Sequence, residues 1–292
     1  MQPCVSAQHI LRQMPSDKGN LPSRSGSDQL PLVSVVVTTF NRENLLRETI
    51  TAIFAQTFRN FELLIIDNNS TDGTEQLVAE LTDERVRYIR NNNGGMVAIN
   101  RNLGIRLAKG QFLAYCDDDD LWLPEKLAKQ VAALEADPSA VTCGCSILIK
   151  TDEAEDLIPR LRWTGAVSLH NMYFRNYLGT SCAMTRTDVL RGLGGFDESR
   201  DYSPYEDYEL WLRLVARNRA LMLKEPLVIY RIHGTNSSPH RARGARLVLK
   251  VLHSMRSRIS ARGPWYWSCM VIRFAHWVIL EALVRIAVRL RK

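Results

Sequence analysis

Long apolar runs are missing from this sequence of 292 residues. Near the carboxyl terminus, no uncharged apolar stretch reaches the roughly 18 residues that a membrane-spanning helix needs. The first 30 residues also lack the apolar core of a signal peptide, and they are rich in Ser, Pro, Gln and Gly. We therefore expect residues 1–30 to form a mostly disordered leader and the protein to stay in the cytosol.

Cysteine is scarce as well. Its distribution lacks the dense, even spacing of a small disulfide scaffold, which favours a reducing compartment. Cys143 and Cys145 would share one face of a strand, but no second Cys or His pair at zinc-like spacing accompanies them, so a zinc site is disfavoured. The six cysteines are Cys4, Cys116, Cys143, Cys145, Cys182 and Cys269.

Acidic residues are almost absent from the end of the chain. Residues 231–292 contain 13 Lys and Arg but a single acid, Glu281. This segment carries +12 and the whole chain +7, which leaves −5 for residues 1–230. A basic tail suits an anionic membrane surface or a nucleic acid. We expect no nucleic-acid partner, because the tail lacks an aromatic stacking pattern or a recognition-helix motif.

Strand and helix patterns alternate from Leu32 onward. With 46% hydrophobic residues, the chain can bury a full core. Such βαβ repetition predicts an α/β fold with a mainly parallel, Rossmann-like sheet and helices on both faces. The predicted strands lie at 33–39, 61–67, 86–89 and 111–116, and helical spacing follows at 46–54, 76–81 and 96–108.

Polar side chains stand where three of these strands end, namely Thr39, Asp67 and Asp117. Ligands of open parallel sheets bind outside the carboxyl ends of the strands, so we expect these residues to meet at one crevice. A dinucleotide site is disfavoured, because no G-x-G-x-x-G follows the first strand.

Four consecutive aspartates, Asp117 to Asp120, follow the strand at 111–116. Carboxylates this close repel one another and lose solvation beside a buried strand, so the cluster is costly unless a cation shares it. Mg²⁺ or Mn²⁺ is the expected cofactor, because hard cations take oxygen ligands and Mg²⁺ is often held by carboxylates plus substrate phosphates. The alternative is an acidic loop that caps the following helix, which accounts for Asp120.

Four segments, in the order in which they occur, resemble the nucleotide-sugar half of the family 2 glycosyltransferases, which have the GT-A fold. They are VVVTTFNR at 35–42, IIDNNSTDGT at 65–74, NRNLG at 100–104 and the aspartates. The resemblance implies a GT-A domain over 31–240. The positive charge of residues 241–292 distinguishes them from this domain as a basic, helical appendage.

The resemblance also implies where a nucleoside-diphosphate sugar binds. Thr39 and Asn41 would border the nucleotide. Asp67 would accept a hydrogen bond from N3–H of uracil or thymine, which implies a UDP- or dTDP-linked donor, and it could also cap its own turn. Asn102 and Arg101 would approach the ribose or diphosphate, although the helix surface suits Arg101 equally well.

Within the cluster, Asp117 and Asp119 match the D-x-D motif of the family. The resemblance implies that Asp119 binds the metal and that Asp117 lies nearer the ribose or a metal-bound water. Asp118 occupies the alternate position and is expected to point away. His233 follows the last strand, where comparable loops carry a His or Arg near the diphosphate, so we assign it to the metal site. A loop histidine without a role is the alternative.

Glu206 and Asp207 precede an apolar helical stripe that contains Trp211. A carboxylate in a first helical turn is favoured by the helix dipole alone. The pair also resembles the acceptor-side motif of the family, in which the Asp is the general base, and this makes Asp207 the catalytic candidate. The resemblance implies a single displacement with inversion. A processive synthase is disfavoured, since no Q-x-x-R-W follows.

The tail has the pattern of an amphipathic helix, and its aromatic residues, such as Trp267, suit a membrane interface. We expect peripheral contact with the anionic inner face of the cell membrane and a sugar or lipid-linked glycan as acceptor, as in cell-surface polysaccharide or glycolipid assembly. Packing of the helix on the catalytic domain is the alternative, and a catalytically silent nucleotide-sugar or membrane-surface binding module is the alternative function. The apolar positions are Ile272, Ala275, Ile279, Ala282, Leu283, Ile286 and Leu290.

Overall fold

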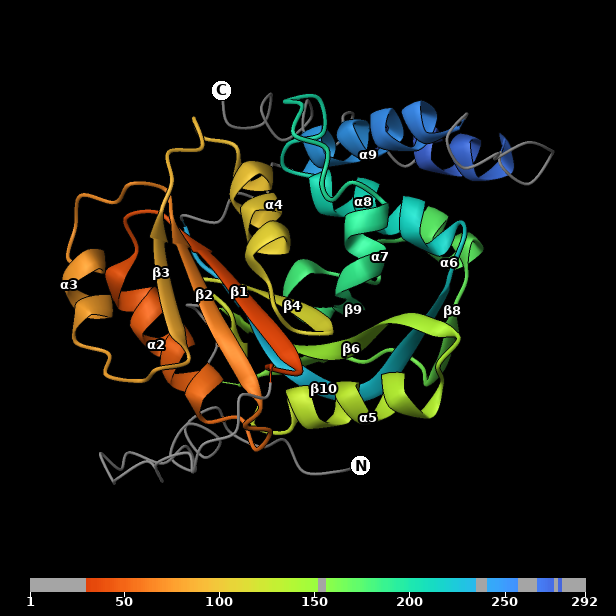
Figure 1. Cartoon of the computed structure of the whole chain (residues 1–292). Coiled ribbons are helices and arrows are strands. Elements are labelled where there is room, and N and C mark those ends of the chain that lie inside the picture. Colours follow the sequence, from red (N-terminus) through yellow and green to blue (C-terminus); the bar gives the residue numbers. More distant parts are fainter. Residues whose placement is uncertain (1–29, 152–155, 235–240, 257–266, 276–277, 280–292) are drawn as a thin grey trace.

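The computed structural model describes residues 30–151, 156–234, 241–256, 267–275 and 278–279. One sheet of ten strands runs through the molecule, with helices on both faces (Figure 1). Residues 1–29 of the predicted leader and all the apolar positions expected beyond residue 279 lie outside the described residues. So does the predicted domain boundary at residue 240.

The first half of the sheet is parallel and contains the four strands that the sequence predicts. Its order is β3-β2-β1-β4. The bounds are Val33–Thr39 for β1, Phe61–Asp67 for β2, Val86–Arg90 for β3 and Phe112–Asp117 for β4. In the register, Thr38 lies opposite Asp117 and Thr39 opposite Asp67. The ends of β1, β2 and β4 therefore share one edge, as expected.

The second half of the sheet is mixed. Strand β9 pairs antiparallel with both β4 and β6, and β10 then runs parallel to β6. Strands β5, β7 and β8 add short antiparallel pairs. The bounds are Leu121–Trp122 for β5, Ala140–Thr151 for β6, Ile158–Arg160 for β7, Gly165–Val167 for β8, Met184–Arg186 for β9 and Arg219–Ile232 for β10.

Helices cover the sheet because successive residues of its strands point to opposite faces, both of which are apolar. Val35 and Val37 pack toward α2, α3 and α5, whereas Val36 packs toward α4, α7 and α8 (Figure 1). The bounds are Glu43–Phe54 for α2, Thr74–Ala79 for α3, Val97–Leu107 for α4, Lys126–Ala136 for α5, Leu169–Phe174 for α6, Thr187–Gly192 for α7 and Glu206–Val215 for α8; Thr180–Cys182 form the 3₁₀ turn η1.

The start of the basic tail packs into the hydrophobic core on the Val36 side of the sheet. Helix α9 (Arg241–Met255) packs beside α8, and its residues Leu252 and Met255 are fully buried. Cys269, in the helical segment 267–275, is buried in that cluster too. None of the helices in the described part of the chain combines the length and apolarity that crossing a membrane requires.

Candidate active site

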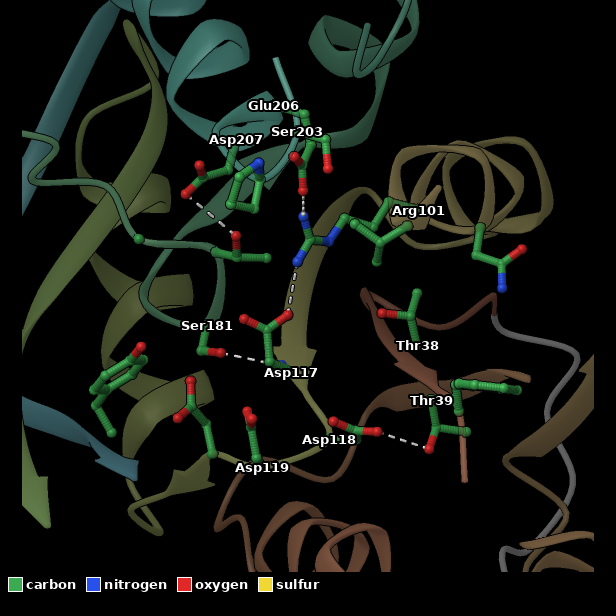
Figure 2. Close-up of a pocket in the computed structure, with 18 of the residues that line it drawn as sticks. Thr38, Thr39, Arg101, Asp117, Asp118, Asp119, Ser181, Ser203, Glu206 and Asp207 are labelled. Carbon is green, nitrogen blue, oxygen red and sulfur yellow. Dashed lines mark hydrogen bonds and ion pairs between the residues drawn. The ribbon is translucent and has the colours of Figure 1, made fainter. Parts of the chain in front are cut away.

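A cavity of about 580 Å³ opens at the carboxyl ends of β1 and β4. Figure 2 shows Thr38 and Thr39 on one side of it, the aspartates below and the start of α8 on the other side. Its wall also includes the 176–182 segment, which runs from the end of α6 into η1. The cavity therefore joins two of the predicted nucleotide residues, Thr39 and Asp117, to the predicted general base, Asp207.

Asp117 sits at the last position of β4, where its N–H donates to Ser181 Oγ over 3.0 Å. Its carboxylate accepts a hydrogen bond from Arg101 Nη2 at 2.8 Å, and its side chain remains 33% exposed toward the cavity. Asp117 thus keeps open coordination positions for a ligand.

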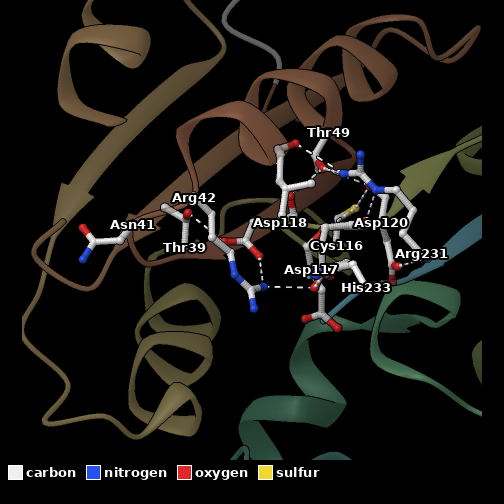
Figure 3. Close-up of polar contacts among 12 residues, drawn as sticks. Thr39, Asn41, Arg42, Thr49, Cys116, Asp117, Asp118, Asp120, Arg231 and His233 are labelled. Carbon is white, nitrogen blue, oxygen red and sulfur yellow. Dashed lines mark hydrogen bonds and ion pairs between the residues drawn. The ribbon is translucent and has the colours of Figure 1, made fainter. Parts of the chain in front are cut away.

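Asp118 does not point away from the site, contrary to expectation. It lines the cavity and accepts hydrogen bonds from Thr39 Oγ1 at 2.8 Å and Arg42 Nη1 at 2.9 Å (Figure 3). Burial raises the pKa of Asp118 to about 6, with Arg42 opposing and Asp119 adding to the rise. The strand has ended at Asp117, so the strict alternation of a strand no longer sets the direction of this side chain.

Asp119 and His233 come together as predicted. Asp119 Oδ2 lies 3.1 Å from His233 Nε2 and 2.9 Å from Arg42 Nη1. The carboxylate therefore lies between an imidazole and a guanidinium.

Asp120 does not cap the next helix. The N-cap of α5 is Glu125, which makes no side-chain capping bond. Asp120 is instead buried and accepts a hydrogen bond from the N–H of Arg231 at 3.3 Å. Burial, together with Asp117 and Asp119, raises the pKa of Asp120 well above its usual value. Asp120 thus links the aspartate turn to β10.

Three arginines offset the charge of the cluster, and the sequence did not single out their contacts. Arg42 bridges Asp118 and Asp119, and Arg231 contacts both Glu48 and the carbonyl of Asp119 (Figure 3). Their positions carry a sequence signal, because Arg42 closes the first family-like motif and Arg231 precedes His233 by two residues.

The third arginine, Arg101, is buried and joins Asp117 to Glu206 (Figure 2). Burial alone lowers its pKa, but the charges of these two carboxylates outweigh burial and raise it above the ordinary value. Asn102, one residue further along α4, turns away from the cavity and bonds to the backbone of Phe196. Since successive helical residues differ by about 100° in direction, only one of the two can face the site.

Asp207 reaches the cavity from the first turn of α8, as predicted. Its Oδ2 accepts hydrogen bonds from Asn176 Nδ2 at 3.1 Å and Thr180 Oγ1 at 3.4 Å. Burial raises the pKa of Asp207 to about 7; Glu206 adds to the rise, and Arg101 offsets part of it. A carboxylate with that pKa suits proton abstraction near neutral pH. No sequence pattern had pointed to Asn176 or Thr180.

Asn41 and Asp67 lie beside the cavity rather than in its wall. Asn41 is exposed, and its Oδ1 accepts a hydrogen bond from the N–H of Thr71 at 2.8 Å. Asp67 is fully buried and accepts hydrogen bonds from Ser70 and from Tyr88 Oη. The turn-capping role considered for Asp67 is therefore present in this structure, and base recognition stays a prediction.

A divalent metal fits the residues around Asp119 only in part. The described residues contain no group of three or more side chains arranged to hold a metal ion. Asp119 and His233 offer one carboxylate oxygen and one imidazole nitrogen, 3.1 Å apart. Mg²⁺ in nucleotide enzymes is commonly held by one or two carboxylates and completed by substrate phosphates, so Asp119 matches the carboxylate part of such a site.

Comparison with solved structures supports the fold. S. aureus TarS 1–349 in complex with UDP-GlcNAc matches with a TM-score of 0.63 and 21% identity, over 77% of this chain and 66%, just under two thirds, of that chain. The mannosyltransferase PcManGT from Pyrobaculum calidifontis, in complex with GDP-Man and Mn²⁺, matches with a TM-score of 0.56 and 20% identity, over 90% of this chain and 81% of that chain. These likenesses confirm the predicted GT-A fold.

Sequence comparison supplies the family. The Escherichia coli protein UDP-Glc:alpha-D-GlcNAc-diphosphoundecaprenol beta-1,3-glucosyltransferase WfaP is 25% identical over 213 residues, which cover 73% of this chain and 82% of that protein. The family described as Glycosyl transferase family 2 matches residues 34–193, from β1 through the aspartate cluster to the end of α7. This match spans more than half of the chain, so the chain belongs to glycosyl transferase family 2.

Proposed function

We propose that this protein transfers a sugar from a nucleoside-diphosphate sugar, UDP- or dTDP-linked, to an acceptor hydroxyl with inversion of the anomeric configuration. The observation that carries the proposal is a cavity lined both by Asp207 and by the ends of β1 and β4. Support comes from TarS and PcManGT, whose solved structures contain UDP-GlcNAc and GDP-Man.

The donor fits the edge formed by β1 and β4. Thr38, Thr39 and Asn68 line this side of the cavity and offer hydroxyl and amide groups to a nucleoside. Arg42 lies where it can reach a diphosphate, since it already contacts two carboxylates of the cluster. Bound at Asp119 and His233, Mg²⁺ or Mn²⁺ would neutralise charge on the nucleoside-diphosphate leaving group.

The acceptor fits beside Asp207. Asn176 and Thr180 donate to one carboxylate oxygen of Asp207, which orients the carboxylate toward an incoming hydroxyl. Asp207 takes the proton of the acceptor hydroxyl as the hydroxyl oxygen attacks the anomeric carbon from the face opposite the nucleotide. One displacement of this kind inverts the configuration, and the product leaves after a single transfer.

A lipid-linked acceptor is the form that we propose. WfaP is named for a diphosphoundecaprenol-linked acceptor. Residues 267–275 of this chain turn Cys269 into the core, but Val271, Ile272 and Phe274 are each more than half exposed. An apolar helix face of this kind suits peripheral contact with the inner face of the cell membrane. Such contact is consistent with the role in polysaccharide or glycolipid assembly that we propose.

A donor screen tests the proposed function. Release of nucleoside diphosphate is measured from UDP- and dTDP-sugars with Mg²⁺, Mn²⁺ or EDTA, and the anomeric configuration of the product is read by NMR. Release that requires an acceptor, a metal and Asp207 supports the proposal. Binding of a nucleotide sugar without turnover under all conditions would instead favour the silent binding module.

A further inference from the structure

The acceptor side of the cavity also carries an arginine, Arg162. Arg162 lines the cavity together with Asn176 and Asp207. It follows β7, and its N–H donates to Ser146 Oγ at 2.7 Å, which fixes its backbone on β6. In the described part of the chain, Arg162 forms no ion pair, whereas Arg101 on the opposite wall has two.

The guanidinium of Arg162 is held in place by aromatic rings. Its central carbon lies 4.9 Å from the ring centroid of Tyr177, and that ring packs edge-to-face on Trp163 with centroids 4.9 Å apart. Stacking on an aromatic face leaves the planar donors of an arginine free to form a fork. The Nε of Arg162 is buried and has no hydrogen-bond partner among the described residues. A buried donor without an acceptor is unfavourable unless a ligand supplies one.

A second arginine stands nearby. Arg175 is the C-cap residue of α6, is exposed and directly precedes Asn176, the residue that bonds to Asp207. Burial lowers the pKa of Arg162, and the charge of Arg175 lowers it further. Arg175 likewise forms no ion pair within the described ranges. The charge of Arg175 thus adds to the positive potential at Arg162, which favours an anionic ligand.

An apolar surface begins beside these arginines. Phe174, next to Arg175, is 45% exposed. Arg273 from the 267–275 segment donates to the carbonyl of Tyr173 at 3.1 Å and to that of Phe174, so the segment with its exposed Val271 lies against α6. A ligand that leaves the cavity beside Asn176 could therefore continue directly onto an apolar helix face.

We infer that Arg162 binds the phosphate group that joins the acceptor sugar to its lipid. The inference rests on the proposed function, since it assumes an acceptor hydroxyl at Asp207. It adds a second anion site, distinct from the donor site at Arg42, Asp119 and His233. The acceptor class that follows is a sugar attached to a lipid through a phosphate or diphosphate, with the lipid leaving along α6.

Acceptor preference tests this inference. The two probes are octyl α-GlcNAc-diphosphate and the uncharged octyl GlcNAc glycoside, and the readout is the ratio of their kcat/KM values. We expect Arg162→Ala to lower this ratio roughly 10- to 100-fold through KM, the range for losing a charge-assisted contact. Arg162→Lys should recover part of it, because a lysine keeps the charge but not the fork.

Arg160→Ala is the matched control, because Arg160 lies two residues away on β7 and is exposed. It should leave the ratio unchanged. Equal losses for both probes in Arg162→Ala, or a weaker UDP affinity by calorimetry, would overturn the inference and assign Arg162 to folding or to the donor. If no donor is turned over, calorimetric binding of the diphosphate probe still decides: binding that Arg162→Ala weakens supports the anion site, and binding that it leaves unchanged, or no binding, refutes it.

Discussion

The adjacent carboxylates of Glu206 and Asp207, at the start of α8, have different roles because their hydrogen-bond partners differ. Glu206 pairs with Arg101 at 2.8 Å, whereas Asp207 accepts hydrogen bonds from the uncharged Asn176 and Thr180. Burial raises the pKa of Asp207 to about 7, and the charge of Arg101 offsets only part of this rise. The same pairing keeps a negative charge beside Asp207 and contributes to its raised pKa.

Replacing Asp207 by Asn should lower turnover by roughly 10² to 10⁴, the range for a missing general base, while donor binding persists. In the unsubstituted enzyme, the pKa of Asp207 is raised to about 7, so this group is protonated and inactive at lower pH. We therefore expect kcat/KM to rise with pH and to level off above about 7. A pH–rate profile that is flat between 5 and 8 would contradict this assignment.

Substituting Glu206 by Gln should move that profile to lower pH. Glu206 raises the pKa of Asp207, and its removal also leaves Arg101 free to lower that pKa further. The shift is read from the acid limb of kcat/KM. Asp188→Asn, an exposed acid at the start of α7, serves as the control and should leave the limb in place.

Asp119→Ala should abolish transfer and weaken Mn²⁺ binding, measured by electron paramagnetic resonance in the presence of UDP. The fold should survive, because removing one of four clustered carboxylates relieves repulsion and Arg42 keeps its contact with Asp118. Far-UV circular dichroism and the melting temperature check this. Unchanged Mn²⁺ affinity or full activity in EDTA would remove Asp119 from the metal site.

At the scale of elements, the regular parts of the fold followed from the sequence and the directions of individual side chains did not. Apolar periodicity, which depends on local residues alone, predicts strands β1, β2 and β4 and helices α2 and α4. Which residue of α4 faces the cavity depends on how α4 sits on β1. In this placement Arg101 faces the cavity and bonds to Asp117, whereas Asn102 bonds to the backbone of Phe196. The antiparallel insertion of β9 likewise depends on distant partners, Thr142 on β6 and Leu113 on β4.

The close packing of α4 on β1 gives a prediction about stability. A Cβ at Gly104 would lie 2.6 Å from Cγ1 of Val36, a fully buried residue of β1. Gly104→Ala should therefore lower the free energy of unfolding by about 1–3 kcal/mol, as overpacked sites do. Urea unfolding measures it. Gly192→Ala on α7, where a Cβ meets nothing within 4 Å, is the matched control and should be neutral or slightly stabilising.

The whole molecule combines a catalytic sheet with a segment that has two contrasting faces. Cys269 is buried and Arg273 bonds to α6, yet Val271 and Phe274 on the same segment are exposed. Both alternatives considered for the tail thus have a structural counterpart, since one face packs on the domain and the other is open. Deleting residues 265–292 would consequently uncover part of the core, and a substitution on the open face is the cleaner test of membrane contact.

Phe274→Glu should weaken binding of the full-length protein to vesicles that contain anionic lipid, because it places a charge on a side chain that is 53% exposed on the apolar face. Leu30→Glu, which alters an exposed residue just before β1, is the control and should bind as the unsubstituted protein does.

Each basic residue near an anionic surface adds about 1 kcal/mol, so high salt and neutral lipid should also weaken binding. Transfer to a short-chain acceptor should persist in Phe274→Glu, because the substituted residue lies outside the catalytic cavity. Sedimentation with vesicles measures the bound fraction, and equal binding of all three proteins to neutral and anionic vesicles would show that this face does not contact the membrane.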